Sequence, residues 1–181
     1  QDGQHASTDE SGSTREEKPT RSITTAALIT ACLRVLLPLS VEGYNVITLC
    51  RDGLERPSLD LDADASIDAW TRGLGDIGAV IHLAGIAHQL SEPAELDRVN
   101  AQWPQRLFEA AARAGVRDFV FLSSVKVLGD VSIRPLQVDD PYAPGDAYGR
   151  SKVKAEQSLL EAQMRHPEIS LVILRIPLVY G

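Results

Sequence analysis

The pattern of apolar and polar positions divides the chain into a short tail and one long patterned region. Residues 1–20 contain no large apolar side chain. Such a segment cannot bury enough surface to offset the entropy that is lost on ordering, so we expect a disordered tail. From residue 21 to residue 181, short apolar runs alternate with stretches in which apolar residues recur at helical spacing. This region is predicted to form one domain.

The apolar runs predict the strands of a parallel sheet. They span 44–50, 79–85, 118–124 and 171–175, with a weaker run at 58–61. Helical spacing is found at 29–41, around 67–74, at 92–114 and at 148–165. Pro38 is unfavourable inside the first of these helices, and the third has a core stripe of Leu96, Val99, Trp103, Leu107 and Ala111. Strands that alternate with helices predict an α/β fold, a Rossmann-like doubly wound parallel sheet with helices on both faces.

Composition narrows the classes of function. The formal net charge is -7 without a cluster of Lys and Arg, which argues against a nucleic-acid surface. The two cysteines, Cys32 and Cys50, are too few for a zinc site or a disulfide framework. No apolar run reaches the roughly 18 residues of a membrane span, and the chain does not begin with a signal-peptide pattern. We therefore expect a cytoplasmic protein without a metal site.

The candidate chemistry lies at Tyr148 and Lys152, which are four residues apart and would share one face of a helix. A phenol has a pKa of about 10, and an ammonium beside it favours the phenolate. The hydroxyl of Ser124, at the end of the 118–124 strand, could bridge the phenol to a substrate oxygen. Such a group can take a proton from a carbinol while a hydride leaves its carbon. Because Tyr-x-x-x-Lys spacing also arises by chance on solvated helices, the motif depends on its surroundings.

Four sequence segments around this motif carry further information: VIHLAG, VRDFVFLSSVKVLGD, PGDAYGRSKVKAE and LRIPLVYG. In this order and spacing, residues 41–181 resemble the extended short-chain dehydrogenase/reductases of the NAD-dependent epimerase/dehydratase family. The segments are most similar to bacterial UDP-glucose and UDP-N-acetylglucosamine 4-epimerases. The resemblance implies an NAD-dependent oxidoreductase step on a sugar nucleotide, with Tyr148 taking the hydroxyl proton, Lys152 lowering the pKa of Tyr148 and binding the nicotinamide ribose, and Ser124 bonding the reacting oxygen. It is also compatible with a homodimer.

The same resemblance implies a larger set of ligand contacts. For the substrate it implies Ser124 and Lys126, although an ordinary surface lysine is the preferred interpretation of Lys126. For the dinucleotide it implies Arg51, Asp60, Leu61, Leu83, Ala84, Gly85, Asn100, Ser123, Tyr148, Lys152 and Pro177. Asp62 competes with Asp60, and Asn100 could instead face solvent. At the end of the second strand, Cys50 and Arg51 stand where an acid would favour NAD, so NADP is left open.

Two departures from the family pattern bear on activity. Counting back from Gly43 puts the three glycines of the phosphate-binding loop at Ala26, Ile29 and Cys32, and the preceding strand reads Arg21-Ser-Ile-Thr-Thr25. Either this part has diverged beyond binding, or the natural N-terminus has been lost or scrambled. The substrate-binding portion that follows Leu-Val-Tyr-Gly in the family is also absent from the sequence.

Three interpretations of the function therefore stay open. The first is an NAD-dependent epimerase, the second a truncated or degenerate homologue that is not catalytic, and the third an NADP-dependent reductase. A dehydratase is disfavoured, because Val125 and Lys126 stand where it would need an acid and a base. Whether the chain is an enzyme is left undecided at this stage.

Overall fold

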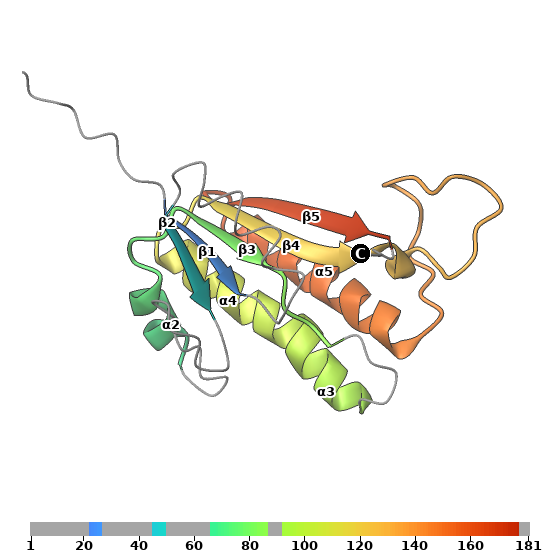
Figure 1. Ribbon diagram of the computed structural model, residues 1–181, viewed down its shortest axis with the longest axis horizontal. Coiled ribbons are helices and arrows are strands. Elements are labelled where there is room, and N and C mark those ends of the chain that lie inside the picture. The colour runs from blue at the N-terminus through green and yellow to red at the C-terminus, as the bar shows by residue number, and fades with distance from the viewer. Residues whose placement is uncertain (1–21, 27–44, 50–65, 87–91, 178–181) are drawn as a thin grey trace, which may run out of the picture.

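Five parallel strands form the sheet of this protein in the computed structural model, which describes residues 22–26, 45–49, 66–86 and 92–177. The strands are β1 (Ser22–Ala26), β2 (Asn45–Leu49), β3 (Ala79–His82), β4 (Asp118–Ser124) and β5 (Ser170–Ile176). Their order across the sheet is β2-β1-β3-β4-β5 (Figure 1). The predicted Rossmann-like parallel sheet is thus confirmed, and its order reverses between β1 and β3, where such folds bind ligands.

Strand β1, between β2 and β3, forms in spite of its polar sequence. It pairs with β2 on one side and with β3 on the other, so the polar stretch that seemed unlike a family strand does occupy the expected position. Ala26 is its last residue and pairs with Leu49 and His82. The first expected glycine position therefore stands at the carboxyl end of this strand. The other two, Ile29 and Cys32, lie outside the described residues, as do the predicted tail, the 29–41 helix and the 58–61 strand.

Helices α2 and α5 each begin after a residue whose side chain caps the helix. Ser66 caps α2 (Ile67–Gly73) by accepting a hydrogen bond from the backbone N–H of Ala69 at 3.2 Å. Asp146 caps α5 (Ala147–Arg165) in the same way, at 2.6 Å from the Gly149 nitrogen.

The predicted helix over 92–114 is interrupted by a wider turn. It consists of α3 (Pro93–Asp97), a π-helical turn at Arg98–Gln102 and α4 (Trp103–Arg113). Gly115 ends it with a φ of +81°, a conformation that glycine adopts without strain. A π turn holds one residue more than an α turn, which a periodicity count alone does not reveal.

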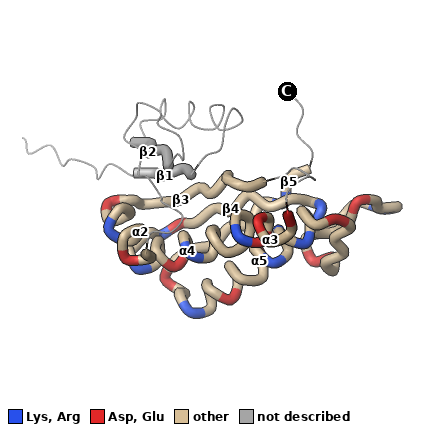
Figure 2. The backbone as a smooth tube through the Cα atoms, turned by 90° about the horizontal axis from the view of Figure 1, so that it is seen from below, with Lys and Arg blue, Asp and Glu red and all other residues tan. Residues whose placement is uncertain are grey.

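The core lies between the sheet and α4 and α5, which run along the same face of β3, β4 and β5 (Figure 2). Phe108 of α4 meets Phe119 of β4 edge to face, with ring centroids 5.2 Å apart. The predicted stripe is buried except at Trp103, which is half-buried beneath the guanidinium of Arg98. Helix α2 packs on the other side of α4, where Arg113 pairs with Asp68.

Among the helices of residues 66–86 and 92–177, none is both long enough and apolar enough to cross a lipid bilayer. The helices described all lie along one face of β3 to β5 (Figure 2). Helices were expected on both faces of the sheet, and the helix predicted at 29–41 is outside the described residues.

Candidate active site

The three residues predicted to act together come from two neighbouring elements at one edge of the sheet. Ser124 is the last residue of β4, while Tyr148 and Lys152 lie in the first two turns of α5. The short 3-10 helix η2 (Val125–Val127), which follows β4, packs against α5 and brings the two elements together (Figure 1). The Ser124 hydroxyl lies close enough to the Tyr148 phenol to lower the pKa of that phenol. The structure therefore places all three where the sequence analysis expected them.

The phenol of Tyr148 does not have the lowered pKa that the sequence analysis expected. Burial raises the pKa of Tyr148 above its usual value, and this effect outweighs that of the nearby Ser124 hydroxyl, which lowers it. The charge of Asp146 raises that pKa further, and the charge of Lys126 lowers it. The Nζ of Lys152 lies 6.0 Å from the centroid of the Tyr148 ring. The phenol is therefore neutral at pH 7.

Lys152 is a buried ammonium at the inner side of this site. Only 3% of the residue is exposed, and its Nζ donates a hydrogen bond to the Leu122 carbonyl oxygen at 2.9 Å. The same Nζ lies 4.6 Å from the centroid of the Phe121 ring, within range of a cation–π contact. Burial lowers the pKa of Lys152 to about 8, against the opposing effect of the Glu156 carboxylate. Lys152 thus keeps its positive charge at neutral pH, while its environment makes that charge unusually easy to lose.

Gly85, just after β3, lets the backbone come close to Lys152. A Cβ atom at this position would lie 3.3 Å from Lys152 Nζ and 3.1 Å from Asn100 Oδ1. Both distances are tighter than ordinary van der Waals contact, so a larger residue would push against the two polar groups. Leu83 and Ala84 lie in the same half-buried stretch. This stretch is consistent with its predicted place beside a ligand.

Asn100 connects the end of β3 to the first turn of α5. The residue is fully buried, which excludes the solvent-facing alternative. Its Oδ1 accepts from the Ile86 N–H at 2.7 Å, and its Nδ2 donates to the Ile86 carbonyl at 2.8 Å and to Ser151 Oγ at 3.0 Å. Ser151 Oγ donates in turn to the Tyr148 carbonyl at 2.7 Å. The π turn thus presents an amide that fixes the backbone of two segments of the site.

Ser123 points away from Ser124, into a buried polar network that the sequence analysis missed. Its hydroxyl donates to Oε1 of Glu156, which is fully buried on α5. Oε2 of Glu156 accepts from the Tyr142 hydroxyl at 2.8 Å and from Arg175 Nη2 at 2.7 Å. An arginine in the otherwise apolar β5 and a glutamate four residues after Lys152 were the available signals.

Lys126 makes other contacts than the predicted one with a diphosphate. Its Nζ pairs with Asp146 Oδ2 and, at 3.2 Å, with Asp130 Oδ1. These hydrogen bonds, that of Asp146 first, raise the pKa of Lys126 above its usual value. Its backbone carbonyl also lies 2.9 Å from where a Cβ of Gly149 would be. In this structure Lys126 therefore fixes the start of α5.

Of the four remaining predicted dinucleotide contacts, one lies within the described residues and three lie outside them. Pro177 is exposed and follows β5 directly. Arg51, Asp60 and Leu61 fall outside the described residues. Their predicted roles at the adenosine end of a dinucleotide stay predictions.

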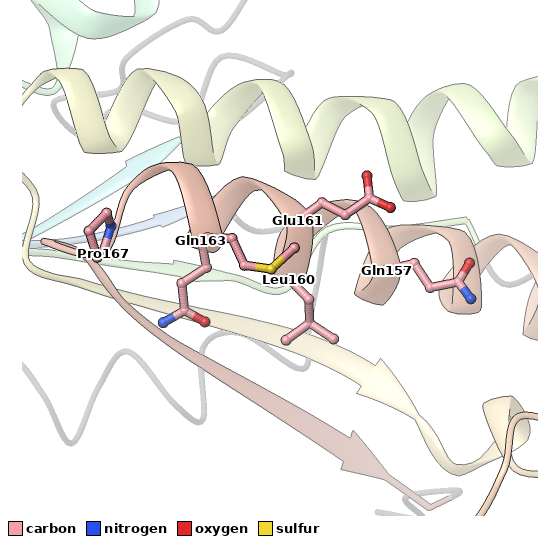
Figure 3. Close-up of a pocket in the computed structure, with 6 residues that line it drawn as sticks. Gln157, Leu160, Glu161, Gln163 and Pro167 are labelled. Carbon is pink, nitrogen blue, oxygen red and sulfur yellow. The ribbon is translucent and has the colours of Figure 1, made fainter.

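A surface hollow lies elsewhere, along the later turns of α5. Figure 3 shows Gln157, Leu160, Glu161, Gln163 and Pro167 around it, and Met164 also contributes to its lining. None of the predicted site residues lines this hollow. It is therefore a feature of the outer side of α5, separate from Tyr148 and Lys152.

Comparisons with known proteins point to one family. The model of the NAD dependent epimerase/dehydratase family matches residues 34–181. An uncharacterized protein of Sinorhizobium fredii (strain NBRC 101917 / NGR234), y4nL, is 32% identical over 151 residues, which are 82% of this chain and 41% of that protein. A UDP-glucose 4-epimerase of Vibrio cholerae is 36% identical over 127 residues, 66% of this chain and 38% of that enzyme.

A similar fold is found among solved structures. The structure of MoeE5 in complex with UDP-glucose and NAD superposes with a TM-score of 0.78 at 28% identity, over 89% of this chain and 55% of that one. The UDP-N-acetylglucosamine 4-epimerase of Bacillus cereus, at 20% identity and a TM-score of 0.76, shares the fold. The chain thus spans about 40% of the two curated relatives and 55% of MoeE5.

Proposed function

The chain belongs to the NAD-dependent epimerase/dehydratase family, and on this basis we propose that it supplies the dinucleotide-binding and proton-transfer part of an NAD-dependent sugar-nucleotide epimerase. The proposed substrate is a UDP-sugar, as in the relatives named UDP-glucose 4-epimerase. The observation that carries the proposal is the convergence of Ser124, Tyr148 and Lys152 at one edge of the sheet, where Gly85 leaves room beside the ammonium.

The residues of this chain suit proton transfer to and from a sugar hydroxyl. Bound NAD would supply a reversible hydride acceptor for the sugar carbon. Ser124, beside the phenol, would hold the reacting oxygen, and Tyr148, once its own proton has passed to solvent, would take the proton of that oxygen as a phenolate. Because burial raises the pKa of Tyr148, the phenol needs positive charge close by to lose its own proton. Lys152 is cationic below a pH of about 8 and is the buried cation closest along the helix.

The dinucleotide fits some parts of the chain better than others. Gly85, Tyr148 and Lys152, near the carboxyl ends of β3 and β4, would hold its nicotinamide end, and the buried Asn100 would fix the backbone of Ile86 beside Gly85. Ala26 stands where the first loop glycine was expected, at the end of β1. A side chain at a close-approach position would cost charge-assisted hydrogen bonds of roughly 1.5–3 kcal/mol each. This favours a second candidate, a homologue with impaired cofactor binding and no catalysis.

Calorimetric titration of NAD and of NADP into the 181-residue chain tests the proposal. We expect NAD to bind about a hundredfold more weakly than to a protein with an intact loop, which corresponds to two lost hydrogen bonds. Lys152→Met should abolish binding. Lys154→Met, which removes an exposed lysine of the same helix that pairs with Asp97, should leave it unchanged.

Three other results of this titration would each contradict a different part of the proposal. If NAD does not bind at millimolar concentration, the chain is the non-catalytic homologue. Tighter binding of NADP would favour the reductase. A micromolar dissociation constant would refute the view that Ala26 and its neighbours impair the loop.

The homodimer that the family resemblance suggests is a further part of the proposal. Leu160 and Met164 are exposed, at 45% and 76%, beside the hollow on the outer side of α5 (Figure 3). Sedimentation equilibrium should give a dimer for the unmodified chain and a monomer for Leu160→Glu. A monomer in both would refute this surface as a dimer interface.

A further inference from the structure

The buried carboxylate of Glu156 lies one turn beyond Lys152 on α5 and is not used by the proposed proton transfer. It is completely buried and accepts hydrogen bonds from three different segments of the chain. Ser123 comes from the end of β4, Arg175 from β5, and Tyr142 from the loop that leads into α5. An anion in this position is costly unless it is paired, and here it has both a cation and two hydroxyl donors.

The position of this network relates it directly to the proposed active site. Ser123 is the covalent neighbour of Ser124, so the hydrogen bond to Glu156 fixes the residue that precedes the reactive hydroxyl. Arg175 also donates through Nη1 to the Val138 carbonyl at 2.7 Å, and its guanidinium lies over the Tyr142 ring at 5.2 Å. The network therefore joins β4, β5, α5 and the loop before α5 directly behind the reactive groups.

We propose that Glu156 is a positioning residue: its buried carboxylate holds the end of β4 through Ser123 and supplies the negative charge that keeps the Lys152 ammonium in place beside Tyr148. This inference rests on the proposed function of Ser124, Tyr148 and Lys152. The carboxylate itself touches neither the substrate nor the reacting atoms. It acts by holding the backbone at the end of β4 and by stabilising the positive charge of Lys152.

The charged and titratable groups around Lys152 make this effect measurable. On α5 these are Tyr148 and Glu156, and on β3 there is His82, whose pKa burial lowers to about 3, so that it is neutral at pH 7. Burial and Glu156 are the two influences on the pKa of Lys152. Arg175 pairs with Glu156 through Nη2 at 2.7 Å. Neutralising Glu156 should therefore lower the pKa of Lys152, whereas a change confined to packing should not.

The experiment is a titration of Lys152 by NMR, following its 13Cε and 15Nζ signals in the full 181-residue chain. The pKa of the wild-type Lys152 is expected at about 8. Glu156→Gln should lower it by about one unit, the effect of losing one nearby opposite charge. In Glu156→Asp, which keeps the negative charge, the pKa of Lys152 should stay close to that of the wild type. Glu161→Gln, an exposed change on the same helix, should leave the titration unchanged.

Two further arms keep the test decisive. If Glu156→Gln does not fold because Arg175 is left unpaired, the double variant Glu156→Gln/Arg175→Met is compared with Arg175→Met, and the pKa of Lys152 should be lower in the double variant, because these two chains differ only in the carboxylate. A folded variant in which Lys152 titrates as in the wild type would overturn the inference. Because the titration needs no dinucleotide, a shift in Lys152 without NAD binding would count against the proposed function alone. Binding of NAD without the shift would count against Glu156 alone.

Discussion

His82 makes the stability of the fold depend on pH between about 3 and 6.5. It is the last residue of β3, 4% exposed, and its ring packs 5.6 Å from that of Phe121 and 6.4 Å from that of Phe119. Burial, and next the charge of Lys152, lower the pKa of His82 from 6.5 to about 3. Between these two values the unfolded chain binds a proton that the folded chain does not. The stabilisation is therefore complete above pH 6.5 and is lost as the pH falls.

The size of the effect follows from the width of the window. Each pH unit below 6.5 costs about 1.4 kcal/mol, so the loss between pH 7.5 and pH 5 is about 2 kcal/mol. This is a large fraction of the 5–15 kcal/mol that a domain of ordinary stability has. Carboxylates with a lowered pKa, such as Asp146, contribute at more acidic pH.

Urea unfolding followed by tryptophan fluorescence measures this effect, because Trp70 is buried in the core. The free energy of unfolding of the wild type should fall by about 2 kcal/mol more between pH 7.5 and pH 5 than that of His82→Leu, which cannot titrate. Groups other than His82 are common to both chains, so the difference isolates its proton. Equal losses in the two chains, within about 0.5 kcal/mol, would refute the burial of a neutral imidazole in this strand.

Two other substitutions test the geometry of the site. Gly149→Ala should lower the melting temperature although alanine favours helices, because its Cβ would lie 2.9 Å from the Lys126 carbonyl; Gly75→Ala, where the nearest atom is at 3.6 Å, should be neutral or stabilising. Asn100→Ala removes three hydrogen bonds and should cost about 3 kcal/mol in unfolding free energy, at about 1 kcal/mol each, whereas Gln102→Ala on the exposed side of the same turn should cost little. Thermal unfolding of the four variants decides both, and a stabilising Gly149→Ala or a harmless Asn100→Ala would contradict the geometry.

The sequence predicted best where side-chain periodicity and capping agree. Strand β4 has the predicted bounds, and α5 begins one residue before the predicted start because Asp146 caps it. The carboxyl ends of parallel strands lie on the same side of the sheet, so the position of Ser124 at the end of β4 and of Gly85 shortly after β3 could be predicted from the sequence. The polar β1 was underestimated, because a strand paired on both sides is held by backbone hydrogen bonds that its side chains do not report.

Contacts between distant segments were beyond the sequence analysis. The bond between Glu156 and Arg175 joins a helix to a strand 19 residues later, and no local pattern marks it. The expected low pKa of Tyr148 failed for a similar reason. Spacing places Lys152 on the same helix face, but burial and the direction of Nζ toward Leu122 decide the outcome.

The π turn at Arg98–Gln102 also affects how this part of the chain can change in length. Each residue of an α-helix advances the rotation by about 100°, so one additional residue turns everything before it relative to everything after it. Deleting a residue here would let the helix run on as a regular α-helix. Leu96 would then rotate out of the core, and Asn100 would no longer reach both Ile86 and Ser151. Exposed side chains such as Arg98 can vary at this turn. The number of residues in the turn cannot, because it sets the rotation between the helix face that buries Leu96 and the contacts of Asn100.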